Sequence, residues 1–116
     1  MQTHKDLDIW KLSMTLVEII YRITSMFPEE EKYGISSQMR RSAVSIPSNI
    51  AEGAARNTVK EYIQYLYISL GSLSELETHV LLSIKLGYIC NGDELLDSIE
   101  KLRRKFLNYI KYKKSK

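Results

Sequence analysis

Apolar residues recur along this chain at spacings of three and four, the period of an amphipathic helix, in four successive segments. The first predicted helix covers about residues 7–26, with an apolar face of Ile9, Leu12, Leu16, Ile19, Ile23 and Met26. The second begins near Ser36 or Ser37, and its apolar stripe is Ile35, Met39, Ala43, Ile46, Ile50 and Ala54. Each stripe predicts a helix face that packs against a core.

Two more helices complete the pattern. The third is predicted over residues 59–86, with an inward face of Tyr62, Leu66, Ser69, Leu73, Leu76, Val80 and Ile84. Thr58 and Glu61 predict a capping box at its start, and Gly87 predicts a left-handed cap at its end. The fourth helix directs Leu95, Ile99, Leu102, Phe106 and Tyr109 inward. No run alternates like a strand and the connections are short, so the sequence predicts an all-α, antiparallel up-down-up-down four-helix bundle, with residues 1–116 as one domain.

A proline lies inside the second predicted helix. Pro47 lacks the N–H that would bond the carbonyl of Ala43, so we expect a kink that does not end the helix. The neighbouring Ser45, Ser48 or Asn49 is expected to bond the freed backbone groups. Small side chains in this segment predict that another helix approaches it closely.

Such an approach would bring a carboxylate to Arg41. The best candidate is Glu75 of the third helix, because it follows Gly71 and Ser72, and a mid-helix glycine that costs about 1 kcal/mol is expected to allow close contact with a neighbour. A pair held between helices specifies register more than it adds stability. In the alternative, Arg40 and Arg41 both face solvent.

The start of the third helix is apolar around most of its circumference. Seven of the nine residues from Tyr62 to Leu70 are apolar or aromatic, a pattern typical of a helix buried on more than one face. Tyr62, Tyr65 and Tyr67 therefore predict an oligomer interface, since tyrosine contributes large area while its hydroxyl reaches a polar rim. The alternatives are tyrosines scattered over a wet surface, or a surface that binds another protein.

Charge is distributed unevenly. Residues 1–100 hold nine Lys and Arg against fourteen Asp and Glu, whereas the basic C-terminal end at residues 101–116 holds eight cations and no acid. These cations are Lys101, Arg103, Arg104, Lys105, Lys111, Lys113, Lys114 and Lys116. Such a cluster attracts phosphate backbones, and Arg40, Arg56 and Lys60 are expected to add contacts. The alternative interpretation is a solubilising tail.

Motifs for catalysis, cofactors or metals are missing from the sequence. It has two histidines, one cysteine (Cys90), no pair of Glu-x-x-His motifs and no Gly-rich phosphate loop, so we expect no enzyme activity, no cofactor and no metal. The internal charged residues Glu52 and Glu75 are expected to be structural, as are Arg41, Pro47 and Asn49. The first ten residues contain no apolar signal segment, and no apolar run reaches the ~20 residues that span a bilayer, so a cytoplasmic protein without membrane contact is expected.

The string SIPSNIAEG at residues 45–53 carries a family resemblance. With Trp10, Gly34, Gln38, Arg41, Glu61, Gly71, Ser72, Glu75, Glu77 and Gly87, it resembles the four-helix-bundle proteins encoded by intervening sequences in bacterial 23S rRNA genes. The resemblance implies a homopentamer of four-helix bundles. A related branch, the accessory variability determinant protein of diversity-generating retroelements, uses a basic surface to engage nucleic acid and a reverse transcriptase.

Together these observations predict a non-enzymatic, oligomeric helical-bundle protein. Its expected partners are other copies of itself, in a pentamer, and structured RNA bound through the basic surface. Binding would depend on charge and shape, because no base-reading helix is evident. The alternative function is that of a structural or adaptor protein whose tyrosine-rich surface binds another protein.

Overall fold

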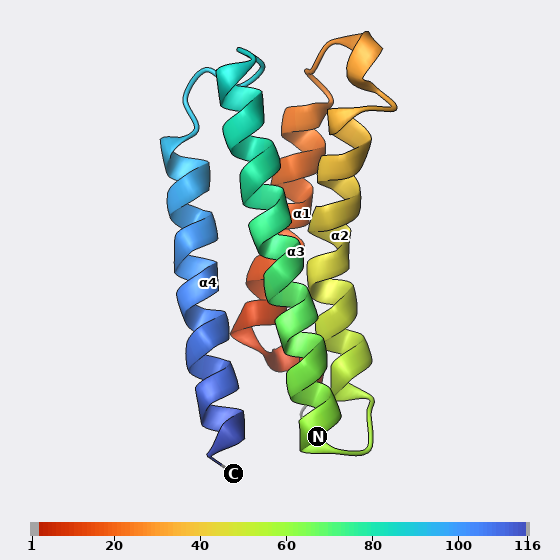
Figure 1. Ribbon diagram of the computed structural model, residues 1–116, viewed down its shortest axis with the longest axis vertical. Coiled ribbons are helices and arrows are strands. Elements are labelled where there is room, and N and C mark those ends of the chain that lie inside the picture. The colour runs from red at the N-terminus through yellow and green to blue at the C-terminus, as the bar shows by residue number, and fades with distance from the viewer. Residues whose placement is uncertain (1–2, 116) are drawn as a thin grey trace.

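The computed structural model describes residues 3–115, and they form four antiparallel helices without a strand (Figure 1). The helices are α1 (Asp8–Thr24), α2 (Ile35–Ala54), α3 (Val59–Lys85) and α4 (Asp93–Lys114), with short 3-10 helices η1 (His4–Asp6) and η2 (Glu29–Glu31). They build an up-down-up-down bundle of 46 × 24 × 22 Å, in which α1 begins and α4 ends at the same end (Figure 1). The predicted fold class is confirmed.

The ends of α3 follow the predicted signals. The Thr58 hydroxyl accepts a hydrogen bond from the Glu61 backbone N–H at 3.1 Å, which satisfies one of the free donors at the helix start. Gly87, just after the helix, has φ 82°, a left-handed conformation that glycine adopts at low cost. These local signals mark both ends of the longest helix.

The core is centred on α2 and α3, the two helices that contact each other most extensively. Met39, Ala43, Ile46 and Ile50 of α2 are fully buried, as predicted. The last predicted core position of α2 is wrong, because Ala54 is exposed and Gly53 is buried in its place. A Cβ atom on Gly53 would lie 2.5 Å from the Cβ of Tyr65, so α3 approaches α2 closely only because that side chain is absent.

The buried face of α1 is rotated from the predicted one. Its buried residues are Ile9, Ser13, Leu16, Ile20 and Thr24, whereas the predicted Leu12 and Met26 are 41% and 83% exposed. Two hydroxyls enter the core because each finds a backbone acceptor one turn earlier. Ser13 donates to the Ile9 carbonyl at 2.5 Å, and Thr24 donates to the Ile20 carbonyl at 2.7 Å.

Pro47 is accommodated inside α2, which continues to Ala54 as predicted. The Asn49 side chain donates to the Ser45 carbonyl at 2.8 Å and to the Ser45 hydroxyl at 2.9 Å. That hydroxyl in turn lies 2.8 Å from the hydroxyl of Ser72 on α3. The polar residues around the proline therefore link α2 to α3 as well as bonding the helix backbone.

Gly71 does not have the role expected from the sequence. A Cβ atom built on it would have no heavy atom within 4 Å among the described residues outside its own helix backbone, so no helix of the same chain approaches it. The close approach of α2 and α3 takes place at Gly53 instead. Gly71 lies on an exposed face of α3, where within this chain it only lowers the stability of the helix.

Candidate nucleic-acid interface

The basic C-terminal end is helical and packed, and it is not a loose tail. α4 continues to Lys114, and its inward residues Phe106 and Ile110 are 0% and 2% exposed. The cations of this segment therefore project from a rigid helix at fixed positions. Lys116, which belongs to the same basic cluster in the sequence, lies outside the described residues.

Carboxylates neutralise two of these cations. Lys101 pairs with Asp97 at 3.1 Å, one turn earlier on α4. Arg103 is half-buried between α3 and α4, and its guanidinium contacts Glu77 at 2.7 Å and Glu100 at 2.6 Å. The hydrogen bond with Glu77 raises the pKa of Arg103 above its ordinary value. Arg103, a candidate phosphate contact, therefore joins α3 to α4 with its charge balanced.

The other cations of α4 keep their charge unbalanced. They are Arg104, Lys105, Lys111, Lys113 and Lys114, and none forms an ion pair within residues 3–115. Lys60 at the start of α3 is also unpaired in this part of the chain. A cation without a protein counterion is the kind that a phosphate backbone attracts most strongly.

Two of these lysines lie against tyrosines of α3. Lys114 Nζ donates to the Tyr67 hydroxyl at 2.8 Å, and Lys113 Nζ lies 5.4 Å from the centre of the Tyr62 ring. The contacts position both ammonium groups without neutralising them. Lys113 and Lys114 also line an open cleft of about 460 Å³ with Val59, Lys60, Ile63, Gln64 and Tyr67. We call it the Tyr67 cleft.

Two arginines expected to extend this surface are engaged elsewhere. Arg40 donates to the Thr24 hydroxyl at 2.8 Å and stacks on Tyr21 at 4.5 Å, which ties α2 to α1 near the opposite end of the bundle (Figure 1). The alternative in which Arg40 faces solvent is therefore wrong. Arg56 pairs with Glu52 at 3.4 Å and donates to the Tyr65 hydroxyl at 2.5 Å, so its charge is balanced.

The three candidate interface tyrosines have different environments. The Tyr62 hydroxyl lies 3.1 Å from that of Tyr109 on α4, and burial, followed by this hydrogen bond, raises the pKa of Tyr62 above its ordinary value. Tyr65 packs on Gly53 of α2. Tyr67 is 44% exposed and its neighbour Ile68 is 50% exposed. Contacts within one chain therefore explain the partial burial of Tyr62 and Tyr65, whereas Tyr67 stays exposed.

The predicted ion pair between Arg41 and Glu75 is present. Arg41 also donates to the Gln38 side chain at 2.9 Å, and His79 Nε2 lies 4.0 Å from Glu75. The buried Nδ1 of His79, which was not predicted from the sequence, has no hydrogen-bond partner in the described structure. The i, i+4 spacing of Glu75 and His79 is the one sign of this contact in the sequence. That spacing predicts an ion pair on the helix surface and does not predict a buried imidazole nitrogen.

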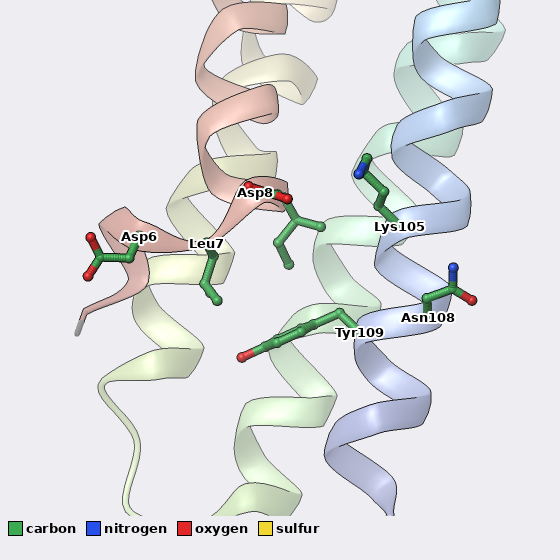
Figure 2. Close-up of a pocket in the computed structure, with 7 residues that line it drawn as sticks. Asp6, Leu7, Asp8, Lys105, Asn108 and Tyr109 are labelled. Carbon is green, nitrogen blue, oxygen red and sulfur yellow. The ribbon is translucent and has the colours of Figure 1, made fainter.

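A second cleft, which the sequence did not predict, lies between α1 and α4. It measures about 510 Å³ and is lined by residues 6–9, Lys105, Asn108 and Tyr109. Figure 2 shows the Lys105 side chain directed into the gap between the two helices and the Tyr109 ring reaching from α4 toward Leu7. It combines two carboxylates with one ammonium group, so its charge does not favour a polyanion.

Residues 3–115 contain no cluster of three or more His, Cys, Asp or Glu side chains with the placement of metal ligands. Their helices also lack the combination of length and apolar character that a bilayer span requires.

Comparisons with known proteins identify the family. The fold is similar to the crystal structure of a protein of unknown function from the S23 ribosomal protein family of Bacteroides thetaiotaomicron VPI-5482, with 23% identity and a TM-score of 0.66 over 92% of this chain and 95% of that chain. At this identity the likeness supports the fold alone. A search of curated proteins finds no match. The model of the 23S rRNA-intervening sequence protein matches residues 5–108, and the chain therefore belongs to that family.

Proposed function

We propose that this protein is a non-enzymatic, homopentameric four-helix bundle that binds structured RNA through the basic end of α4. One observation carries the proposal: five cations of α4, together with Lys60, have no carboxylate partner in residues 3–115. They are held by a packed helix, so their positions are fixed, with Lys113 and Lys114 beside α3 and Lys105 beside α1. The accessory proteins of diversity-generating retroelements, a related branch that this chain resembles less closely, engage nucleic acid through a basic surface.

The binding would be driven by charge. Each phosphate neutralised by a lysine or arginine releases condensed counterions, which favours association and makes affinity fall as salt rises. Cations already paired with protein carboxylates contribute little, because they bring no unbalanced charge. Contacts of this kind recognise the shape and phosphate spacing of an RNA more than its base sequence.

Assembly would strengthen these contacts. A ring of subunits repeats the basic surface, and several weak contacts made together give a higher overall affinity than any one of them. The surface best suited to subunit contact is an exposed face of α3 formed by Ile68, Gly71, Thr78 and Leu82, which we call the Gly71 face. Ile68 and Leu82 are 50% and 44% exposed, and Gly71 between them leaves room for another helix.

The same face supports the alternative function. If the subunits do not associate, the exposed Ile68 and Leu82 remain for contact with a different protein, and the chain acts as an adaptor. The mass of the particle in solution distinguishes the two functions.

The test replaces the cations Arg104 and Lys111 by glutamine and measures affinity for an RNA hairpin across a range of salt concentrations. Both residues are exposed, so the fold should be unaffected. We expect weaker binding, with a slope of log affinity against log salt that is shallower by about 0.9 for each phosphate that the variant no longer neutralises. Truncation is unsuitable, because a deletion after Tyr109 would remove the buried Ile110.

Lys101→Gln is the matched control, because its charge is already balanced by Asp97. We expect this variant to retain most of the parent affinity. If the unaltered protein does not bind the hairpin at low salt, the RNA-binding function is wrong and the adaptor function is favoured.

A further inference from the structure

We propose that the Tyr67 cleft binds one or two unpaired nucleotides of a single-stranded nucleic acid, with a base against the Tyr67 ring and a phosphate among Lys60, Lys113 and Lys114. The inference rests on the proposed nucleic-acid function and names the site that accepts an unpaired strand. The cleft lies at the basic end of the bundle, between the first turns of α3 and the last turns of α4 (Figure 1).

The charge of the cleft suits a phosphate. Its lining includes three lysines and no acidic residue, and none of these lysines is paired with a carboxylate within the described chain. The cleft also lies at the positive end of the 27-residue helix α3. The Glu61 carboxylate at that end is turned to the Thr58 hydroxyl, 3.1 Å away, and does not line the cleft.

The Tyr67 ring is available for stacking. Lys114 Nζ lies 2.8 Å from the hydroxyl but 5.1 Å from the ring centre, so the ammonium group lies beyond the hydroxyl and does not cover a ring face. Tyr67 is 44% exposed, and the adjacent Val59 is 45% exposed. Ile63 adds a third apolar side chain to the lining. An aromatic ring among apolar neighbours is a surface on which a nucleobase stacks.

The lysines are positioned before a ligand arrives. Lys114 is held by the Tyr67 hydroxyl, and Lys113 lies against the ring of Tyr62, which is itself bonded to Tyr109 at 3.1 Å. Aromatic partners restrict the motion of an ammonium group yet leave its charge available. Less conformational entropy is then lost when a phosphate binds.

The chemistry selects an unpaired strand over a duplex. Bases in an RNA duplex are stacked on each other, so a side-chain ring cannot stack on their faces, whereas single strands expose those faces to aromatic side chains. A cleft of about 460 Å³ is large enough for a nucleotide. Arg104 and Lys111 of α4 lie outside the cleft, so they are available to contact the phosphates of a single strand or of a duplex.

Two probes separate the cleft from the basic surface: a ten-nucleotide thymidine oligonucleotide and a fully paired, blunt-ended RNA duplex. Tyr67→Ala should weaken binding of the oligonucleotide about five- to hundredfold, the range for loss of one stacked base, and should change affinity for the duplex by less than twofold. Tyr67→Phe keeps the ring and should retain most of the affinity for the oligonucleotide. Lys113→Gln should weaken oligonucleotide binding and reduce its salt dependence.

Lys111→Gln, an exposed lysine outside the cleft, is the matched control and should affect both probes equally. If Tyr67→Ala binds the oligonucleotide as tightly as the parent, the cleft proposal is overturned while binding of the duplex still supports the basic surface. If Tyr67→Phe loses as much affinity as Tyr67→Ala, stacking is excluded. If the parent binds neither probe at low salt, both the cleft proposal and the RNA-binding function are wrong.

Discussion

Gly53 lies at a close contact between the two most extensively packed helices, α2 and α3. A Cβ atom there would lie 2.5 Å from the Tyr65 Cβ and 3.0 Å from the Tyr62 Cδ1. Both contacts involve atoms close to the α3 backbone or fixed in a packed ring, so neither can move without shifting a helix. The absence of one methyl group thus sets the distance between α2 and α3.

Gly53→Ala should therefore destabilise the protein, even though alanine favours a helix. We expect the free energy of unfolding, measured by urea denaturation, to fall by about 1 to 3 kcal/mol because of overpacking. Ala54→Ser, at the exposed position next to it, is the control and should change stability by less than about 0.5 kcal/mol. An increase in stability on Gly53→Ala would show that α3 does not approach α2 as closely as described.

At the residue scale, sequence patterns predicted the apolar core of α2 but not the polar residues in the core of α1. The spacing of apolar residues does not predict that Ser13 and Thr24 are buried. Both lie in the core because their hydroxyls donate to backbone carbonyls of their own helix. The close helix approach predicted at Gly71 is wrong, because the sequence does not show which of two glycines a neighbouring helix approaches.

Helices α3 and α4 are joined by the hydroxyl pair of Tyr62 and Tyr109. The burial of Tyr62, together with this contact, makes the free energy of unfolding fall at alkaline pH. Burial, more than the hydrogen bond, raises the pKa of Tyr62 above its ordinary value of 10.0. Above that pH the unfolded chain releases the Tyr62 proton while the folded chain keeps it, so the folded state loses stability as pH rises. Below that pH the contribution is fully present.

Tyr62→Phe should remove this dependence. Between pH 10 and pH 11, the parent should lose up to about 1.4 kcal/mol of stability per pH unit more than the variant, the linkage for one proton. At neutral pH the variant should be less stable by about 1 kcal/mol, because the bond to Tyr109 is removed. Denaturation measured across this pH range tests both. Tyr33→Phe, at a position 87% exposed, should follow the parent, and equal slopes for all three proteins would contradict the burial of Tyr62.

At the element scale, the sequence predicted each helix to within a few residues, because caps and glycines act locally. It did not predict which cations of α4 are neutralised. Glu77, the partner of Arg103, lies 26 residues earlier on another helix, and its position depends on how α3 and α4 pack. The sequence did not predict the Tyr67 cleft for the same reason. Tyr67 and Lys114 are 47 residues apart, and their contact depends on how α3 and α4 pack.

For the whole molecule, the antiparallel order of the helices followed from short connections and was predicted correctly. The order places the start of α3 beside the end of α4, and this brings Lys60 into the cleft with Lys113 and Lys114 (Figure 1). The same order leaves the Gly71 face exposed on the outside of α3. Assembly through that face is the prediction that belongs to this scale.

Ile68→Glu should lower the particle mass from that of a pentamer to that of smaller species, because a charge buried in a subunit contact is costly. Light scattering coupled to size-exclusion chromatography measures the mass, and circular dichroism should show unchanged helix content. Met26→Glu, at an apolar residue 83% exposed and far from α3 in the sequence, is the control and should leave the mass unchanged. A monomeric parent at micromolar concentration would refute the assembly.

Cys90 offers a direct means of counting the subunits. It is the single cysteine of the sequence, and it is exposed in the turn between α3 and α4, at the end of α4 opposite to Lys113 and Lys114 (Figure 1). A maleimide dye would therefore attach once per chain and remain clear of the Tyr67 cleft. The number of photobleaching steps in a single particle would then equal the number of its subunits, whether or not nucleic acid is bound.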